Sequence, residues 1–135
     1  MGLTEQALLA FCASEGVTVR ESSQVPGMGK YVHATRTIWL NTRLSTRERT
    51  PVLLHEVLHM QAGHVGPQPP AIERKIRRDV ARILIKQTDY ARAERIGGGN
   101  LYTIAEELDQ PAWLVRDYRT VLEGRLLGRP GCRIA

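Results

Sequence analysis

The chain has 135 residues, enough for one domain with a hydrophobic core that needs no disulfide framework, and its composition is ordinary for a globular protein. The formal charge of +5 and the pI of about 9.7 predict weak attraction to acidic partners but exclude no partner class. No apolar run approaches the roughly 18 residues of a membrane span, and the N-terminus lacks the pattern of a signal peptide, so we expect a cytoplasmic protein.

The first predicted element is an amphipathic helix over residues 4–15. Thr4 is suited to its N-cap, and Gly16 to its end. Cys12 lies on the apolar face and is interpreted as a small buried hydrophobic residue. The second cysteine, Cys132, lies in a tail rich in Gly, Pro and Arg. Neither cysteine has a close cysteine or histidine neighbour, so we do not expect either to bind zinc.

A small sheet is predicted next. Residues 17–20 alternate as a short strand does, and a polar loop with Gly and Pro follows at 21–29. In residues 30–41, two runs rich in aromatic and β-branched side chains flank a turn near 34–36, which predicts a β-hairpin. His33 belongs to this hairpin, and we expect it on a solvated face rather than at a site.

The longest predicted helix begins at Ser45. Ser45 and Glu48 have the spacing of a capping box. Pro51 indicates either a kink in this helix or a restart with Thr50 as cap, because an interior proline removes a backbone hydrogen bond. We expect the helix to end near Gly63, before a turn rich in Gly and Pro.

This helix carries the pattern HExxH at residues 55–59. Residues i and i+4 lie on the same face of a helix, so His55 and His59 can direct two nitrogens at one point, as in a tetrahedral zinc site. Glu56 flanks that point and can reach a metal-bound water as general base. Apolar residues surround the motif, and a buried pair of histidines and a glutamate requires partners that a metal would supply.

A second long helix is predicted over residues 71–87, with an apolar face and a basic face. The short Pro-rich connection makes it double back against the motif helix, which brings one of its acids to the metal. Glu73 is assigned as the third zinc ligand, and Asp79 as a carboxylate that hydrogen-bonds a ligating histidine. On a continued helix, His64 points about 140° away from His59, so we expect a role at the helix end or in a substrate pocket.

In the last third of the chain, the sequence predicts a flexible connection at Gly97–Gly99. It also predicts two short helices, 104–108 and 113–118, with a tight turn between them. This order of elements is typical of a helix-turn-helix motif. We interpret it as a small subdomain that packs on the core or docks a substrate. DNA binding is the weaker interpretation, because acidic residues such as Glu106 and Asp117 oppose it electrostatically.

These residues together resemble a known family. The motif HEVLH, the Gly63-His64 dipeptide and the helix IERKIRRDVARILI are similar to the ImmA/IrrE-type metallopeptidases of phages, mobile elements and bacteria, in particular their short actinobacterial and phage forms. The resemblance covers nearly the whole chain, including the hairpin GKYVHATRTIWLN. It implies that zinc is held by His55, His59 and Glu73, and that Glu56 is the catalytic base.

We therefore expect an α+β fold. Its zincin-like metallopeptidase core comprises an N-terminal helix, a hairpin or small sheet, the HExxH helix and a packing helix, and a helical subdomain follows. The expected boundaries are 1–95 for the core, 96–125 for the helix-turn-helix-like subdomain and 126–135 for a tail.

The resemblance also implies a function. Members of the family are zinc-dependent endopeptidases that cleave or inactivate a helix-turn-helix repressor, which makes a regulatory protein the expected substrate. The alternative is a non-enzymatic regulator that binds a repressor or DNA and keeps zinc as a structural element. Replacing Glu56 with Gln separates the two, because only an enzyme depends on that carboxylate.

Overall fold

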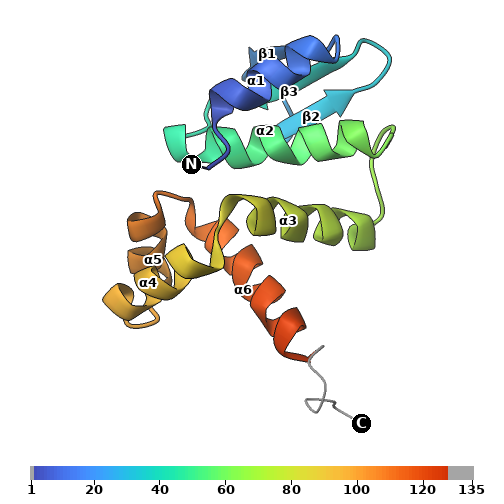
Figure 1. The fold of residues 1–135 in the computed structure, drawn as a ribbon. Coiled ribbons are helices and arrows are strands. Elements are labelled where there is room, and N and C mark those ends of the chain that lie inside the picture. Colours follow the sequence, from blue (N-terminus) through green and yellow to red (C-terminus); the bar gives the residue numbers. More distant parts are fainter. Residues whose placement is uncertain (1, 128–135) are drawn as a thin grey trace. The chain divides into compact units, whose positions relative to one another are not determined.

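The computed structural model describes residues 2–127 and shows an α+β fold, as expected. The chain forms two compact units that divide inside a helix, after Ile76 (Figure 1). The predicted boundary after residue 95 stays a prediction. The predicted tail overlaps the last helix by two residues and otherwise lies outside the described residues, as does Cys132. The elements in order are α1 Glu5–Ser14, β1 Thr18–Ser22, β2 Gly29–Val32, β3 Thr37–Asn41, α2 Thr46–Gln61, α3 Pro70–Leu84, α4 Gln87–Gly97, α5 Leu101–Leu108 and α6 Ala112–Leu127.

The first unit contains a three-stranded sheet with strand order β1-β3-β2. The hairpin is present: β2 and β3 are antiparallel, with Tyr31 opposite Ile38. The strand after α1 runs to Ser22, beyond the predicted range, and it pairs with β3 in parallel. Because β3 takes the centre, β2 is left as an edge strand.

Helices α1 and α2 cover one face of this sheet (Figure 1). Ile38 and Leu40 point into this layer and are fully buried, whereas Trp39 between them points to the other face and is half-buried. Strand β2 approaches α2 so closely that a Cβ added at Gly29 would lie 2.8 Å from Val52 Cγ1. Glycine at this position therefore sets the distance between the edge strand and the helix.

Helix α2 begins as predicted. Ser45 is its N-cap, and both hydrogen bonds of the capping box with Glu48 are present. Pro51 lies inside the helix, which does not restart at Thr50. The helix ends at Gln61, and Gly63 adopts a left-handed φ of 72°, which turns the chain out of the helix.

The second unit is helical. The predicted helix over 71–87 ends earlier, at Leu84, and a separate helix, α4, follows it. Helix α5 packs against both α4 and α6, and Gly98 ends α4 with φ 59°. The unit's own core is apolar apart from tyrosine hydroxyls and comprises Val80, Ala81, Ile85, Tyr90, Ala93, Ile104, Ala105, Leu114, Val115, Tyr118 and Val121.

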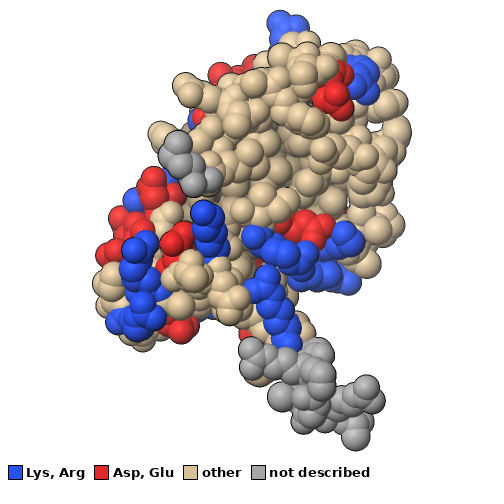
Figure 2. All heavy atoms as spheres, viewed as in Figure 1, with Lys and Arg blue, Asp and Glu red and all other residues tan. Residues whose placement is uncertain are grey.

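Charges of both signs are interspersed over the helices of the second unit (Figure 2). Arg82 pairs with Asp79, and Arg92 pairs with Asp89, each one helical turn apart. This pattern is typical of a solvated helical surface. Within residues 2–127, no helix combines the length and the apolar character needed to cross a bilayer.

Candidate metal centre and its cleft

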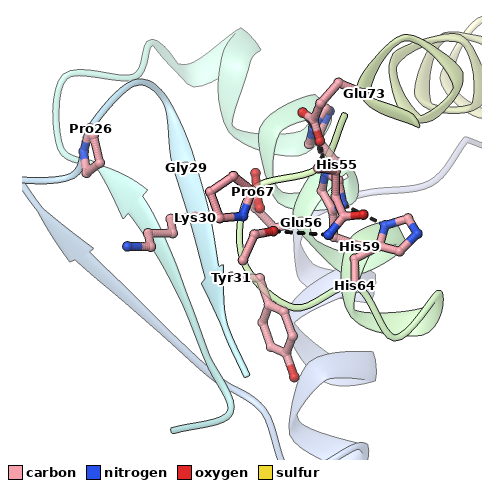
Figure 3. A pocket seen from close by; sticks show the side chains of 12 residues that line it. Pro26, Gly29, Lys30, Tyr31, His55, Glu56, His59, His64, Pro67 and Glu73 are labelled. Atoms are coloured by element: carbon pink, nitrogen blue, oxygen red, sulfur yellow. Dashed lines mark hydrogen bonds and ion pairs between the residues drawn. The ribbon is translucent and has the colours of Figure 1, made fainter. Parts of the chain in front are cut away.

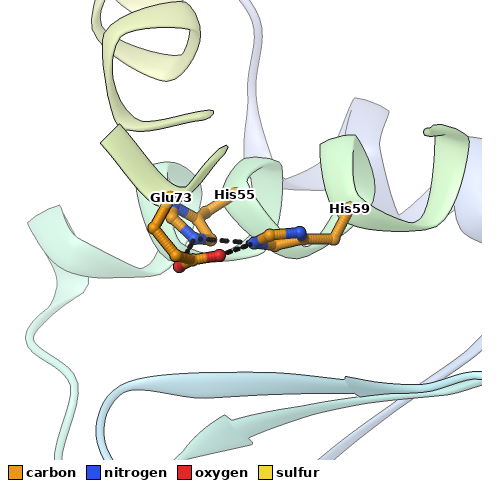
Figure 4. A group of neighbouring side chains, drawn as sticks. All are labelled: His55, His59 and Glu73. Carbon is orange, nitrogen blue, oxygen red and sulfur yellow. Dashed lines mark hydrogen bonds and ion pairs between the residues drawn. The ribbon is translucent and has the colours of Figure 1, made fainter. Parts of the chain in front are cut away.

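Three side chains of the first unit converge on one point (Figure 4). His55 Nε2 and His59 Nε2 lie 3.2 Å apart. The Glu73 carboxylate faces both histidines, with Oε2 3.3 Å from His55 Nε2 and Oε1 2.6 Å from His59 Nε2. Within residues 2–127, these three residues form a group with the donor atoms to hold a metal ion, all within 4.8 Å of one another.

The geometry of the donors fits zinc. Ligand atoms about 2.0–2.1 Å from a tetrahedral ion lie about 3.3–3.4 Å from each other. The 3.2 Å between the two histidine nitrogens is close to this value, and Glu73 presents a different carboxylate oxygen to each histidine, at 3.3 Å and 2.6 Å. Burial lowers the pKa of His59, which favours the neutral imidazole that binds metals. Two nitrogens and one carboxylate leave a fourth position open, as in catalytic rather than structural zinc sites.

Glu73 reaches the histidines because of where α3 begins. Pro70 is the first residue of α3, a position that tolerates the missing N–H, and Glu73 lies in the first turn. A carboxylate there is stabilised by the positive end of the helix dipole. Asp79, the other acid weighed for this helix, lies in the second unit and pairs with Arg82.

His64 lies next to a ligand candidate but not among the three donors. Its Nδ1 is 2.9 Å from His59 Nδ1, the nitrogen on the far side of the ring from the convergence point. The contact exists because α2 ends at Gln61 and the chain turns back, with the His64 N–H donating to the His59 carbonyl. One of the two Nδ1 atoms must carry the proton and the other must accept it.

Glu56 points into the space between α2 and the sheet and is only 8% exposed. Burial, and next the negative charge of Glu73, raise the pKa of Glu56 to about 7. The backbone N–H of Tyr31 donates a hydrogen bond to the Glu56 carboxylate and partly opposes this shift. The side chain can therefore both accept and release a proton near neutral pH.

A cleft of about 480 Å³ opens onto these groups (Figure 3). One wall is the edge strand β2, a second is α2, and the loop between α2 and α3 contributes a third. Its lining comprises Pro26, Gly29, Lys30, Tyr31, His55, Glu56, His59, His64, Gly66, Pro67, Gln68 and Glu73.

The free edge of β2 faces away from β3. The Asn41 N–H donates to the Met28 carbonyl, so by the alternation of an antiparallel pair, Lys30 also bonds toward β3. The backbone groups of Gly29 and Tyr31 point to the opposite side. The bond from the Tyr31 N–H to Glu56 agrees with this direction.

Sequence reasoning placed His33 on a solvated surface, and it is exposed, with Nδ1 3.0 Å from the Tyr31 hydroxyl. It did not identify the hydrogen bond from Tyr31 to Glu56 or the contact of His64 with His59. The alternation of side chains in the hairpin is a sequence signal that could have indicated the contact of Tyr31 with Glu56. No local sequence signal indicates the contact of His64 with His59, because that contact depends on how the chain turns after Gly63.

A family model for the IrrE N-terminal-like domain, Peptidase_M78, matches residues 12–108. The match includes all three donor side chains and Glu56, and it ends with α5. No curated protein matched the chain.

Proposed function

Because the chain belongs to the Peptidase_M78 family of IrrE N-terminal-like domains, we propose that it is a zinc-dependent metalloendopeptidase that cleaves a specific regulatory protein. The observation that carries this proposal is the convergence of His55, His59 and Glu73 beside the buried carboxylate of Glu56. His55, His59 and Glu73 would hold the zinc ion, and Glu56 would be the catalytic base.

The chain's own residues supply the proton transfers. Zinc, when bound, acts as a Lewis acid that acidifies water and stabilises negative charge developing on oxygen. Glu56 takes a proton from the water that attacks the scissile carbonyl, and then delivers it to the leaving amine. Burial, which raises the pKa of Glu56 in the metal-free protein, makes the carboxylate a stronger base for the first step.

The substrate reaches these groups as an extended segment. The outward backbone groups of Gly29 and the carbonyl of Tyr31 on β2 can hydrogen-bond to such a segment by strand addition, whereas the Tyr31 N–H already donates to Glu56. The cleft is walled by one strand, one helix and one loop, which suits a linker or loop of the substrate rather than a folded domain. A helix-turn-helix repressor of a phage or mobile element is the substrate we propose, supported by the family resemblance.

Metal content tests the site first. Elemental analysis of the purified protein should find about one zinc per chain, and His55→Ala and Glu73→Ala should each lose it. Glu123→Gln, which changes an exposed carboxylate on α6, is the matched control and should keep the metal. Zinc retained by Glu73→Ala would transfer the third ligand to another residue, and a parent protein that takes up no zinc would end the metallopeptidase proposal.

Proteolysis is tested by expressing the parent chain or Glu56→Gln in the same bacterial host and comparing the new protein N-termini in the two cultures. The parent should produce a small number of new termini, in a DNA-binding regulator, that are absent with Glu56→Gln. The Glu123→Gln control should reproduce the parent pattern. Identical termini in all three cultures, with zinc bound, would favour the non-enzymatic regulator.

A further inference from the structure

The sheet face opposite α1 and α2 carries an aromatic side chain between two cations. Trp39 on the central strand lies opposite Arg20 on one side and Lys30 on the other. These three side chains share one face because paired residues in neighbouring strands point the same way. The Arg20 guanidinium lies 5.6 Å from the centre of the Trp39 ring, and both cations are exposed.

A shallow groove of about 220 Å³ lies on this face, beside the indole. Its floor is mainly apolar, formed by Trp39 and Val32, and the loop at Val25 and Pro26 forms its side. An indole left half-exposed beside an apolar hollow is a common feature of surfaces that bind another molecule.

The groove adjoins the cleft. Pro26 and Lys30 line both, so the edge strand β2 is the ridge between them. A segment bound along the free edge of β2 places alternate side chains on the two faces of the sheet. One set faces the cleft with Glu56, and the other set faces the groove beside Lys30 and Val32.

We infer that this groove, lined by Val25, Pro26, Lys30, Val32 and Trp39 and with Arg20 beside the Trp39 ring, is a subsite for the protein substrate. It binds an aromatic or aliphatic side chain that has carboxylates two residues before and after it, on the same face of the bound segment. The inference rests on the proposed function, since the cleft must hold an extended segment. The apolar floor selects the large side chain, and the cations Arg20 and Lys30 select the carboxylates that share its face. Cleavage is then directed by residues away from the scissile bond.

The test measures binding without catalysis. The chain contains two tryptophans, so Trp113→Phe leaves Trp39 as the only indole, and adding Glu56→Gln prevents cleavage. This protein is titrated with three acetylated, amidated nonapeptides: Gly-Ser-Glu-Thr-Phe-Thr-Glu-Ser-Gly, in which both Glu share a face with Phe, the same peptide with Ser for Phe, and the same peptide with Lys for both Glu. Trp39 fluorescence should change saturably with the first peptide. The Kd of each of the other two peptides should be at least about fivefold higher.

Two variants locate the site. Lys30→Glu should weaken binding of the acidic peptide about five- to tenfold and improve binding of the Lys peptide. Arg43→Glu reverses an exposed charge that lines neither cavity, so it is the matched control and should bind as the parent does. Trp39→Ala, followed by calorimetry, should abolish the preference for Phe over Ser.

Three results would overturn the inference: equal binding of the three peptides, no saturable signal, or equal effects of Lys30→Glu and Arg43→Glu. A thymidine oligonucleotide that saturates the Trp39 signal more tightly than the acidic peptide would also overturn it, and would make this face a stacking surface for single strands. Peptide binding without any proteolysis by the zinc-loaded parent would contradict the proposed function. Proteolysis with no preference in the peptide titration would contradict the subsite alone.

Discussion

Burial of the Glu56 carboxylate should make the metal-free protein less stable as the pH rises. The pKa of Glu56 is raised from 4.5 to about 7 in the folded protein. The folded state therefore holds the proton over a pH range in which the unfolded chain releases it. By linkage, the free energy of unfolding falls as the pH rises from about 4.5 through about 7. Glu56→Gln removes this dependence, because the amide does not titrate.

The magnitude follows from the two pKa values. A shift of about 2.5 pKa units is worth roughly 3 kcal/mol when fully expressed, of which roughly 2.5 kcal/mol appears between pH 5 and pH 8. Between pH 5 and pH 8, the free energy of unfolding of Glu56→Gln should therefore rise by roughly 2.5 kcal/mol relative to that of the parent. All other titrating groups are common to both proteins, so they largely cancel in the comparison.

The assay is urea unfolding at pH 5 and pH 8 with a chelator present, followed by Trp39 fluorescence in the Trp113→Phe background. Trp39 lies in the first unit, so it reports the unit that contains Glu56. Glu123→Gln is the control for loss of an exposed carboxylate and should change stability by little at either pH. Parallel pH dependences for the parent and Glu56→Gln would refute the argument that burial of this carboxylate opposes its ionisation.

Three further outcomes are expected. His64→Leu removes the partner of His59 Nδ1, so it should weaken zinc binding about 10- to 100-fold, measured in competition with a chromogenic chelator. His64→Asn should retain much of the zinc affinity. Equal zinc affinities for the two variants would contradict this prediction. Gly29→Val should lower the free energy of unfolding by about 1–3 kcal/mol in thermal melts, because its side chain would overlap Val52, and an unchanged melting temperature would show that β2 can move away from α2. Ser45→Ala should cost about 1 kcal/mol by the same measurement, because it removes the side-chain cap of α2.

Local patterns in the sequence determined those parts of the site that lie on one helix. The 3.6-residue period alone brings His55 and His59 to one face, and the capping box alone sets the start of α2. The hairpin was likewise predictable, since its strands are close in sequence and carry strand-forming residues. Within α3, helix geometry favoured Glu73 over Asp79 but did not decide between them.

Tertiary structure decided the contacts between segments far apart in the chain. The turn after Gly63 and the start of α3 at Pro70 together determine which acidic residue of α3 meets His59. Residue spacing predicts neither the direction of this turn nor the orientation of α3. The same turn brings His64 back to His59, although an ideal continued helix would point it away. The parallel pairing of β1 with β3 leaves β2 as an edge strand beside α2, and so determines which backbone groups face Glu56. Sequence periodicity specifies which face of an element is apolar, but packing selects the partner of that face.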